Sequence, residues 1–347
     1  MINDDKERYS RQTILKGFGE AGQHKLSLAK VLVIGAGGLG CPALQYLTAA
    51  GIGCIGIADA DVISLSNLHR QTLYTTSEIG LFKVDIATKK LNAVNPNIKI
   101  IKHQLNIDNQ NALSIISGYD YVLDGSDNFA TRYMVNDACF ILNKPLVFGA
   151  VAQFQGQLAI FNVADASALK TNYRDIFPNP PKKGEVLNCA EAGVMGVLPG
   201  IIGTMQAAEI IKLITGIGQP VINKLLTYNL LNNDIYDINI QPSKSKNNQP
   251  LTEKEFQQMD YNNFCNLTQK PIIEIDASQF LTLSKMPSAI VIDVREAGEL
   301  PLISTFKHLQ VPMTVFKENI VNIKEQTIIL FCQHGIRSIY AGEMIQE

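Results

Sequence analysis

The sequence lacks the features that would assign the chain to a specialised class of protein. Its six cysteines are far apart and include no Cys-x-x-Cys pair, which excludes a disulfide framework and makes a reducing cytoplasm the expected location. The formal net charge of only −2 argues against a general binder of nucleic acid or of an anionic membrane. We find no apolar run long enough to span a bilayer, and the N-terminal MINDDKERYS is too polar for a secretory signal.

The first half of the chain alternates short apolar runs with helix-like segments, which predicts an α/β fold with βαβ units on a mainly parallel sheet. We expect strands over residues 31–34, 53–58, 98–101, 119–123, 146–151 and 157–162. We expect helices over residues 41–50, 84–91, 130–142 and 198–214. Residues 165–188, which contain FPNPPKKG, fit neither period and are predicted to form a loop.

The composition changes near Gln241, where QPSKSKNNQP is polar and has no hydrophobic periodicity. Order resumes with predicted strands over residues 272–275, 289–294 and 327–331 and helices over 278–283 and 338–345. The 347 residues are enough for one large domain and a small one. We therefore predict a large domain over 1–240, a linker over 241–269 and a smaller α/β domain over 270–347.

A glycine-rich turn follows the first predicted strand. Gly35-x-Gly37-x-x-Gly40 lies between a strand and a helix, where small residues let the backbone approach a phosphate and the helix N-terminus favours an anion. Asp59 lies 19 residues beyond Gly40, at the end of a second strand, where a carboxylate can bind ribose hydroxyls. Taken alone, these residues also fit an NAD(P)-dependent oxidoreductase.

Donor side chains near this turn favour a different ligand. They lie in the N-terminal segment ERYSRQ and after the second predicted strand, and are Arg8, Arg11, Asn67, Arg70, Gln71 and Lys83. A nicotinamide site needs an apolar pocket for hydride transfer, whereas these groups match phosphate oxygens. The residues therefore favour a nucleoside triphosphate.

The ordered motifs RYSRQ, GAGGLG, DADVISLSNLHRQ, GLFK, LDGSDN and NCAEAGVMGVLPGIIG carry a resemblance to a known family. Together they resemble the ubiquitin-activating-enzyme-like adenylyltransferases, and most of all the bacterial enzymes that activate the sulfur carriers of molybdopterin and thiamine biosynthesis. The resemblance covers about residues 5–240. It implies a Rossmann-like adenylation domain with a mixed, mainly parallel sheet.

The resemblance also implies an ATP site. The residues that it assigns to the nucleotide are Gly35, Gly37, Gly38, Gly40, Asp59, Asn67, Arg70, Gln71, Lys83, Asp127 and Asn128. Asp127 would hold Mg²⁺, and Arg11 would reach the triphosphate of a neighbouring subunit, which implies a homodimer. Arg11, Arg70, Lys83 and Asp127 would be the catalytic residues.

The implied reaction is the adenylation of a small ubiquitin-like sulfur carrier. Its C-terminal Gly-Gly carboxylate would attack the α-phosphate of ATP and expel pyrophosphate. An α-carboxyl group titrates at about 3.5, so the nucleophile is already ionised and needs no general base. Positioning and charge neutralisation would then carry catalysis. His69, inside the motif, is interpreted as a contact or packing residue, and the choice between the molybdopterin and thiamine pathways stays open.

The cysteines receive separate interpretations. Cys189 precedes a predicted apolar helix, whose N-terminus would lower its pKa. In the family this position can form a thioester or acyl disulfide with the carrier, and the alternative is a packing role. Cys41, Cys54 and Cys139 fall on core-facing positions and are interpreted as packing residues. Cys265 lies in the predicted linker and has no evident partner.

A second motif lies in the small domain. CQHGIR, Cys332–Arg337, joins an apolar strand to a helix, and its backbone N–H groups would stabilise a thiolate or persulfide at Cys332. It resembles the active-site loop of rhodanese sulfurtransferases, and Asp293, Arg295 and His308 match that family too. The resemblance implies sulfur transfer, with a cysteine desulfurase as a candidate donor. The chain ends before the last strand and helix of such a domain, so we expect an incomplete domain, either a degenerate remnant or a truncated product.

One expected metal site is missing. Many relatives hold a structural zinc with two Cys-x-x-Cys pairs, but Asn172 and Asp175 stand where the first pair is expected, and the second pair, near Gln241, is also absent. Four thiolates favour zinc, so we predict no zinc and another means of holding this loop.

Two alternatives to adenylation stay open. One is the NAD(P)-dependent oxidoreductase, argued from the glycines and Asp59 alone. The other is a non-catalytic scaffold that binds the carrier without activating it.

Overall fold

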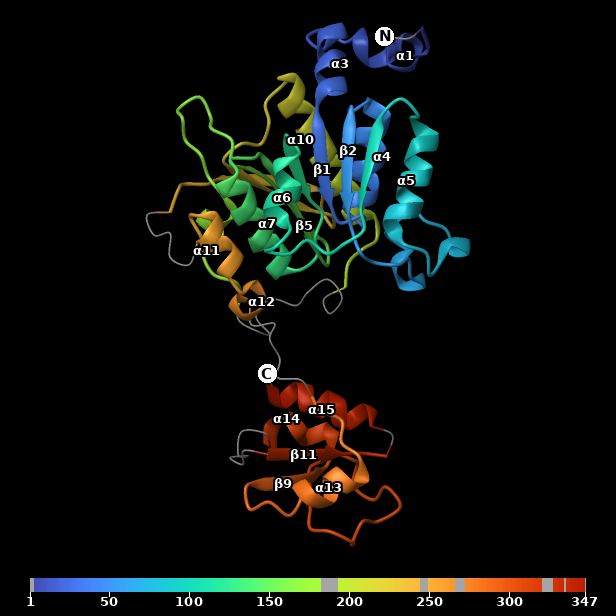
Figure 1. Ribbon diagram of the computed structural model, residues 1–347, viewed down its shortest axis with the longest axis vertical. Coiled ribbons are helices and arrows are strands. Elements are labelled where there is room, and N and C mark those ends of the chain that lie inside the picture. The colour runs from blue at the N-terminus through green and yellow to red at the C-terminus, as the bar shows by residue number, and fades with distance from the viewer. Residues whose placement is uncertain are drawn as a thin grey trace. The chain divides into compact units, whose positions relative to one another are not determined.

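The computed structural model describes residues 3–181, 193–243, 249–265, 272–319, 327–333 and 335–346. They belong to two compact units, Met1–Cys265 and Asn266–Glu347, which are drawn in Figure 1. Each unit is described by itself.

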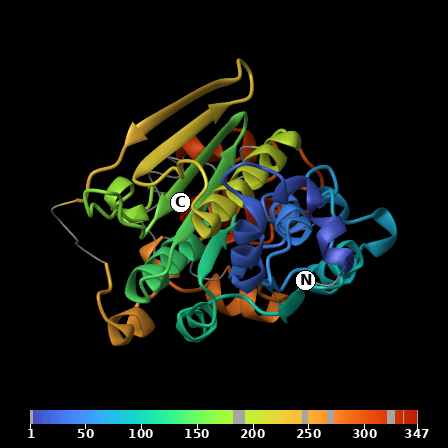
Figure 2. The ribbon, with the colours of Figure 1, turned by 90° about the horizontal axis from the view of Figure 1, so that it is seen from above.

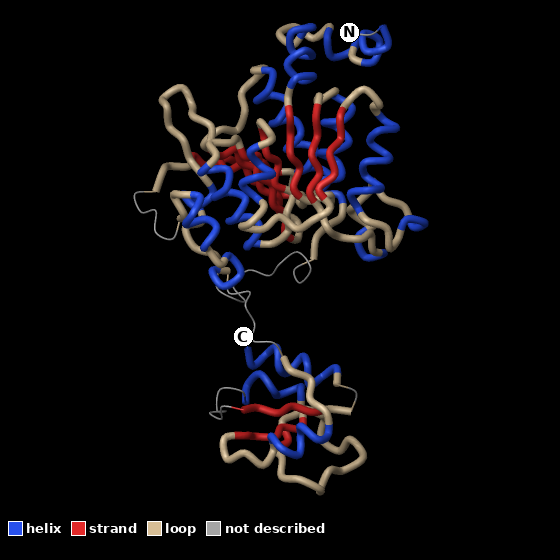
Figure 3. Tube along the Cα trace, in the orientation of Figure 1, coloured by secondary structure: helices blue, strands red, loops and turns tan. Residues whose placement is uncertain are grey.

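The first unit is built on an eight-stranded sheet of order β3-β2-β1-β4-β5-β6-β7-β8. Its strands are β1 (Lys30–Ile34), β2 (Cys54–Ala58), β3 (Lys99–His103), β4 (Tyr121–Asp124), β5 (Leu146–Ala152), β6 (Gln155–Phe161), β7 (Lys224–Asn229) and β8 (Asp234–Asn239). The pairs from β3 to β5 are parallel, and those from β5 to β8 are antiparallel. The mixed, mainly parallel sheet that the sequence predicts is confirmed. Figure 3 shows its strands in red.

Helices cover both faces of this sheet. They are α1 (Asn3–Arg8), α2 (Ser10–Thr13), α3 (Gly19–Leu28), α4 (Gly40–Ala50), α5 (Lys83–Val94), α6 (Ala112–Ser117), α7 (Phe129–Ile141), α8 (Tyr173–Ile176), α10 (Val197–Thr215), α11 (Glu253–Gln258) and α12 (Tyr261–Phe264). One apolar core takes buried residues from α3, α4, α5 and α10, and a second takes them from α6, α7, α11 and α12. Figure 2 shows β7 and β8 at the edge of the sheet.

The central strands explain where a ligand site can form. Val31–Ile34 of β1 are all buried because the strand is covered on both faces, which is why this run is apolar throughout. The chain adds β2 and β3 on one side of β1 and then crosses to add β4 on the other. The carboxyl ends of β1 and β4 therefore flank the switch point of the sheet, where such folds bind ligands.

Helix α10 corrects one expectation. Its 19 residues are long and apolar enough to cross a membrane by length and composition, although we found no such run in the sequence. Half of the apolar stretch is buried inside the unit. Buried Gln206 donates to the carbonyl oxygens of Asp124 at 2.7 Å and Val147 at 3.2 Å. These contacts are those of a helix in the core of a globular unit, and α10 is therefore interpreted as a core helix.

The boundary between the units differs from the predicted linker. Residues 249–265, assigned to the linker, belong to the first unit, where α11 and α12 pack on α7. Phe256 is fully buried, and Tyr261 and Cys265 are buried with it. The polar stretch that suggested a linker is followed by apolar side chains that complete the core, so the boundary falls after Cys265.

The core-facing cysteines of the sequence analysis are largely confirmed. Cys41 and Cys139 are fully buried, and Cys54 is half-buried. Burial raises the pKa of Cys41 to about 12 and that of Cys265 to about 11. These two thiols therefore stay protonated near neutral pH and act as packing groups.

The second unit holds a three-stranded parallel sheet of order β10-β9-β11. Its elements are β9 (Ala289–Asp293), β10 (Leu309–Gln310), β11 (Thr327–Phe331), α13 (Ala277–Leu283), α14 (Phe316–Asn319) and α15 (Ile336–Gln346). Its core includes Ile292, Phe316 and Ala341. The strand predicted over 272–275 is wrong: these residues have no regular structure, and Ile273 is 75% exposed.

Candidate active site

The glycine loop, Gly35–Gly40, joins β1 to α4 at the carboxyl end of the central strands. Gly35 has a φ of +87°, and a Cβ there would lie 2.8 Å from the carbonyl oxygen of Gly125. A Cβ on Gly40 would lie 1.9 Å from the carbonyl oxygen of Gly35. Only glycine fits these two positions, so the loop packs directly on the segment that follows β4.

Asp59 follows β2, and its carboxylate is hydrogen-bonded to the glycine loop. Oδ2 accepts from the Ala36 N–H at 2.8 Å, and Oδ1 accepts from the Asp61 N–H at 2.8 Å. Burial raises the pKa of Asp59, while the charge of Lys83 and the two N–H donors oppose that rise. The carboxylate is fixed at the place where doubly wound folds bind a ribose.

Arg70 and Gln71 lie against the glycine loop. A Cβ on Gly38 would lie 3.5 Å from Cδ of Arg70, and one on Gly37 would lie 3.6 Å from Nε2 of Gln71. Gln71 is buried, and its Oε1 has no partner among the described residues. The carbonyl oxygen of Asn67 accepts from the N–H groups of both Arg70 and Gln71 at 3.0 Å, which sets the turn that brings them here.

Lys83, the first residue of α5, is held by Asp61. Its Nζ lies 2.7 Å from Oδ2 of Asp61, and its N–H donates to the Asp61 carbonyl oxygen at 2.9 Å. The Lys83 side chain is 6% exposed, whereas that of Asp61 is 66% exposed, so water or another anion can replace this carboxylate. We call the glycine loop, the Asp59 carboxylate bonded to it and the side chains of Arg70, Gln71 and Lys83 the cation cradle.

Asp127 and Asn128 stand between β4 and α7. Asn128 caps the helix by accepting from the Thr131 N–H at 2.9 Å. Asp127 lines a cavity of about 400 Å³ at the carboxyl edge of the sheet. Other lining residues include Phe129, Arg132, Gln157, Tyr173 and Phe177. A single carboxylate beside a phosphate-binding loop is an arrangement that suits Mg²⁺, which shares its coordination with phosphate oxygens.

One candidate residue is not brought to this site, and another is not among the described residues. Arg11 is exposed and lies in α2, which precedes β1 at the amino end of the sheet, whereas the glycine loop follows the carboxyl end; Figure 1 shows α1 and α3, the neighbours of α2, at that amino end. Arg11 therefore does not serve the site of its own subunit from this position. Cys189 lies outside the described residues.

A polar clamp, formed by Asp137, Arg174 and Tyr261, holds the segment near α8. Arg174 donates from Nε and Nη2 to the two carboxylate oxygens of Asp137, both at 2.7 Å, and Tyr261 donates to Oδ2 at 2.9 Å. The side chains of Arg174 and Asp137 are 4% and 0% exposed. The clamp joins α8, α7 and α12, three elements far apart in the sequence.

The clamp lies in the segment where the sequence analysis looked for zinc ligands. Asn172 and Asp175 form a capping box at the start of α8, and Oδ1 of Asp175 accepts from the Ser243 N–H at 2.8 Å. Hydrogen bonds thus connect the two places where cysteine pairs were expected. Within the described ranges no group of three or more His, Cys, Asp and Glu side chains could hold a metal ion. The absence of zinc stays a prediction.

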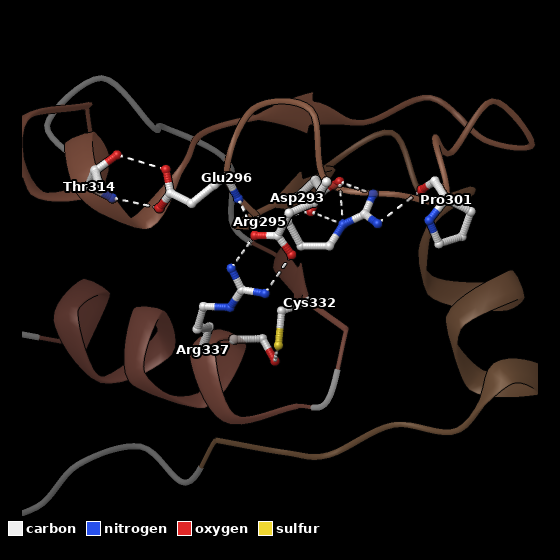
Figure 4. Close-up of polar contacts among 9 residues, drawn as sticks. Asp293, Arg295, Glu296, Pro301, Thr314, Cys332 and Arg337 are labelled. Carbon is white, nitrogen blue, oxygen red and sulfur yellow. Dashed lines mark hydrogen bonds and ion pairs between the residues drawn. The ribbon is translucent and has the colours of Figure 1, made fainter.

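The cysteine loop of the second unit lies between β11 and α15 (Figure 4). The Sγ of Cys332 lies 3.6 Å from Oγ of Ser338, in the first turns of α15. Arg337 grips Glu299 with both terminal nitrogens, with Nη2 at 2.8 Å from Oε2. These bonds lower the pKa of Glu299 to about 2, so this carboxylate is ionised near neutral pH and holds Arg337 beside the cysteine loop.

Asp293 and Arg295 brace the turn that follows β9. Arg295 donates from Nε and Nη2 to Asp293 at 2.9 and 2.6 Å, and from Nη1 to the Pro301 carbonyl oxygen at 3.0 Å. Burial opposes ionisation of Asp293, but Arg295 lowers its pKa below the usual value. The ring of His308 packs edge-on against Phe331, so His308 belongs to an aromatic cluster.

One feature of the site was missed from the sequence. We did not expect Asp61 to pair with Lys83, although the Asp-x-Asp spacing after β2 contains it. His69 was interpreted as a contact or packing residue, and its Nε2 lies 2.8 Å from Nη1 of Arg70, in agreement with a contact role.

The amino-acid sequence matches the model of the ThiF family over residues 9–250. This chain belongs to the ThiF family. The matched residues contain the whole eight-stranded sheet, the glycine loop and the cation cradle.

Curated relatives of this ThiF-family chain extend the comparison. The "Sulfur carrier protein adenylyltransferase" of Thermus thermophilus is 45% identical over 267 residues, which are 76% of this chain and 98% of that protein. The "Probable adenylyltransferase/sulfurtransferase MoeZ" of Mycobacterium tuberculosis is 37% identical over 351 residues, 98% of this chain and 88% of that protein. The "Adenylyltransferase and sulfurtransferase MOCS3" of Drosophila grimshawi is 40% identical over 90% of this chain and 72% of that protein. The last two alignments extend into the second unit.

Solved structures share the fold of the first unit. The crystal structure of Escherichia coli MccB with MccA-N7isoASN has a TM-score of 0.60 at 23% identity and covers 70% of this chain and 74% of that chain. The structure of the same protein with ATP has a TM-score of 0.59 at 23% identity and covers 68% and 72%. At this identity the likeness establishes the fold alone.

Proposed function

We propose that this protein adenylates a sulfur-carrier protein with ATP. The observation that carries the proposal is the cation cradle: a glycine loop at the switch point of the sheet, with Arg70 and Lys83 beside it and Asp59 bonded to it. The names of the relatives, sulfur carrier protein adenylyltransferase and adenylyltransferase/sulfurtransferase, supply the class of reaction. The ThiF family favours this reaction over an NAD(P)-dependent oxidoreductase.

The cradle assigns a role to each part of ATP. Asp59 binds the ribose, and the glycine loop at the N-terminus of α4 binds phosphate oxygens. Arg70 and Lys83 neutralise charge on the triphosphate, and Asn67 contacts it through its neutral amide. Mg²⁺, held by Asp127 and phosphate oxygens, would supply further positive charge. The buried Oε1 of Gln71, which has no partner in the described part of the chain, is an acceptor that a water or a hydroxyl of the bound ligand would satisfy.

The nucleophile is the Gly-Gly carboxylate of the carrier. It is ionised at neutral pH because an α-carboxyl titrates at about 3.5. Its oxygen bonds to the α-phosphorus while the bond to the β-phosphate oxygen breaks, which gives an acyl adenylate and pyrophosphate. The 400 Å³ cavity beside Asp127 has room for an extended chain end, and Arg132 on its wall offers the carboxylate a cation. Catalysis consists of orientation and charge neutralisation.

A homodimer would complete the site. Arg11 lies at the amino end of its own sheet, so only the Arg11 of a second subunit can meet the triphosphate. Such a partner would add one more cation to the cradle. Cys189, as a covalent acceptor of the activated carrier, stays a prediction, and so does the cytoplasmic location.

The second unit would transfer sulfur. Cys332, next to the start of α15, would carry a persulfide, with a cysteine desulfurase as the proposed donor of its outer sulfur. That outer sulfur would attack the acyl adenylate and release AMP, which gives an acyl disulfide. A second thiol would then cleave the S–S bond, which leaves a thiocarboxylate on the carrier and a disulfide between Cys332 and that thiol. A Cys332→Ser variant should lose sulfur transfer from thiosulfate to cyanide while adenylation continues. Equal sulfur transfer by wild type and variant would contradict this role.

ATP–pyrophosphate exchange tests the main proposal. Purified carriers that end in Gly-Gly, from molybdopterin and thiamine pathways, are mixed with the full chain, ATP, Mg²⁺ and labelled pyrophosphate. We expect exchange with at least one carrier and a loss of about 10²–10³-fold for Arg70→Ala. Exchange with no carrier would overturn the enzyme proposal, and carrier binding without exchange would favour the scaffold. The carrier that supports exchange identifies the pathway.

A further inference from the structure

Arg70 is held by two neighbours on its own loop. Its Nη1 donates to the Ser66 carbonyl oxygen at 3.1 Å and to Nε2 of His69 at 2.8 Å. Nη1 carries two hydrogens, so both bonds form together, and neither uses Nε or Nη2. The stem of Arg70 runs past Gly38, which keeps the guanidinium next to the glycine loop. The two bonds therefore set the direction in which Arg70 presents its remaining donors.

The contact with Arg70 defines the state of the His69 ring. A guanidinium only donates, so Nε2 must accept and the ring proton must be on Nδ1. Protonation of the ring would remove the acceptor and put a second cation beside Arg70. Arg70, in its own loop, and the uncharged main chain of Gly196, at the start of α10, lie against the ring. The bond to Arg70 thus exists only with a neutral imidazole.

Gly196 keeps His69 in place. A Cβ on Gly196 would lie 2.3 Å from the His69 carbonyl oxygen and 3.0 Å from its Nδ1, so the residue fits closely against the start of α10. The His69 side chain is nonetheless on the exposed surface. It buries little area, and its replacement should leave the stability of the unit unchanged. An ordered but exposed ring beside Arg70 is better placed to orient that arginine than to support the fold.

We propose that His69 is a positioning residue for adenylation, which as a neutral imidazole holds Arg70 in the orientation that meets the triphosphate. This inference rests on the proposed contact of Arg70 with ATP. A protonated ring would have no acceptor at Nε2 and would release Arg70, so ATP binding should be weaker in acid than at neutral pH.

Two substitutions separate this role from packing. His69→Gln keeps an acceptor, Oε1, at the reach of Nε2 but does not titrate, and His69→Leu removes the acceptor at similar volume. In carrier-dependent ATP–pyrophosphate exchange at about pH 8, we expect the KM for ATP to rise about tenfold in His69→Leu and to stay within about twofold in His69→Gln. His24→Leu, at an exposed histidine of α3, is the matched control and should leave the KM unchanged.

The pH dependence supplies the decisive readout. Exchange by wild type and by His69→Gln is measured at low ATP from about pH 8 to about pH 5.5, and the rate of wild type is divided by that of the variant. The titration of ATP and of the carrier affects both rates equally and cancels in this ratio. We expect the ratio of wild type to His69→Gln to fall about tenfold. A constant ratio overturns the proposal, and so does a folded His69→Leu variant with the wild-type KM. If His69→Leu unfolds at a lower temperature than wild type, the pH dependence of the ratio alone tests the proposal. A wild type without exchange at any pH overturns the proposed function instead, which keeps the two failures distinct.

Discussion

The polar clamp and the cation cradle use the same kinds of side chain for opposite purposes. In the clamp, Asp137 and Arg174 are buried together, and Tyr261 adds a third hydrogen bond. In the cradle, buried Lys83 is paired with a carboxylate, Asp61, that is 66% exposed. A buried pair cannot change partners without leaving a charge unpaired, whereas a half-exposed pair can exchange its carboxylate for a phosphate. The clamp stabilises the fold, and the cradle is ready to bind.

Breaking the clamp should have the largest effect on stability. Asp137→Asn removes the charge that Arg174 faces and leaves a buried guanidinium unpaired, which costs about 3–5 kcal/mol of unfolding free energy. Denaturant titration of the full chain measures the loss. Asp237→Asn, which breaks an exposed pair with Lys224, is the control and should leave the midpoint of the denaturant titration nearly unchanged.

The clamp can also be replaced rather than broken. Combining Asp137→Leu with Arg174→Met removes both charges and should recover most of the stability lost in Asp137→Asn. A double variant as unstable as the single one would show that hydrogen bonds of the clamp, rather than its charge balance, hold the segment near α8.

The clamp could not be predicted from the sequence, whereas most of the cradle could. Gly35, Gly40, Arg70 and Lys83 lie in one span of fewer than 50 residues, within motifs whose spacing fixes their geometry. The members of the clamp come from three separate elements, and their pairing depends on how α12 packs on α7. The polar composition near Gln241 suggested a linker over 241–269, but the residues that follow this short polar stretch are buried in the first unit.

The edges of the sheets were also missed, for a related physical reason. All residues of β8 (Asp234–Asn239) are exposed, so no buried face gives the strand a hydrophobic period. The apolar run at 272–275 pairs with no strand among the described residues, although its composition suits one. The buried strands β1 and β4 matched their predicted positions within two residues, because burial on both faces forces an apolar run.

Removing a cation of the cradle should affect activity strongly and stability little. Lys83→Met keeps the length of the side chain but loses its charge, so ATP–pyrophosphate exchange should fall about 10²–10³-fold. The fold should persist because the carboxylate of Asp61 is exposed and returns to water. Lys90→Met, which breaks the Lys90–Glu78 pair on the same helix, is the matched control and should keep its exchange rate. A large loss of stability in Lys83→Met would make this lysine a structural group like Arg174.

Asp61→Asn should have the smallest effect. Asp61→Asn removes the carboxylate that competes with phosphate for Lys83. In the free protein the Lys83 ammonium then lacks an anionic partner, so the variant should bind ATP a few-fold more tightly than wild type. Calorimetric titration of ATP measures this affinity, and Asp85→Asn, which breaks the exposed Lys102 pair near the same helix end, is the control. Weaker ATP binding in Asp61→Asn would mean that Asp61 orients the Lys83 side chain for the ligand and does not compete with the ligand. The cradle would then be a fixed arrangement, like the clamp. It would not be a set of cations that exchange their present partners for a triphosphate.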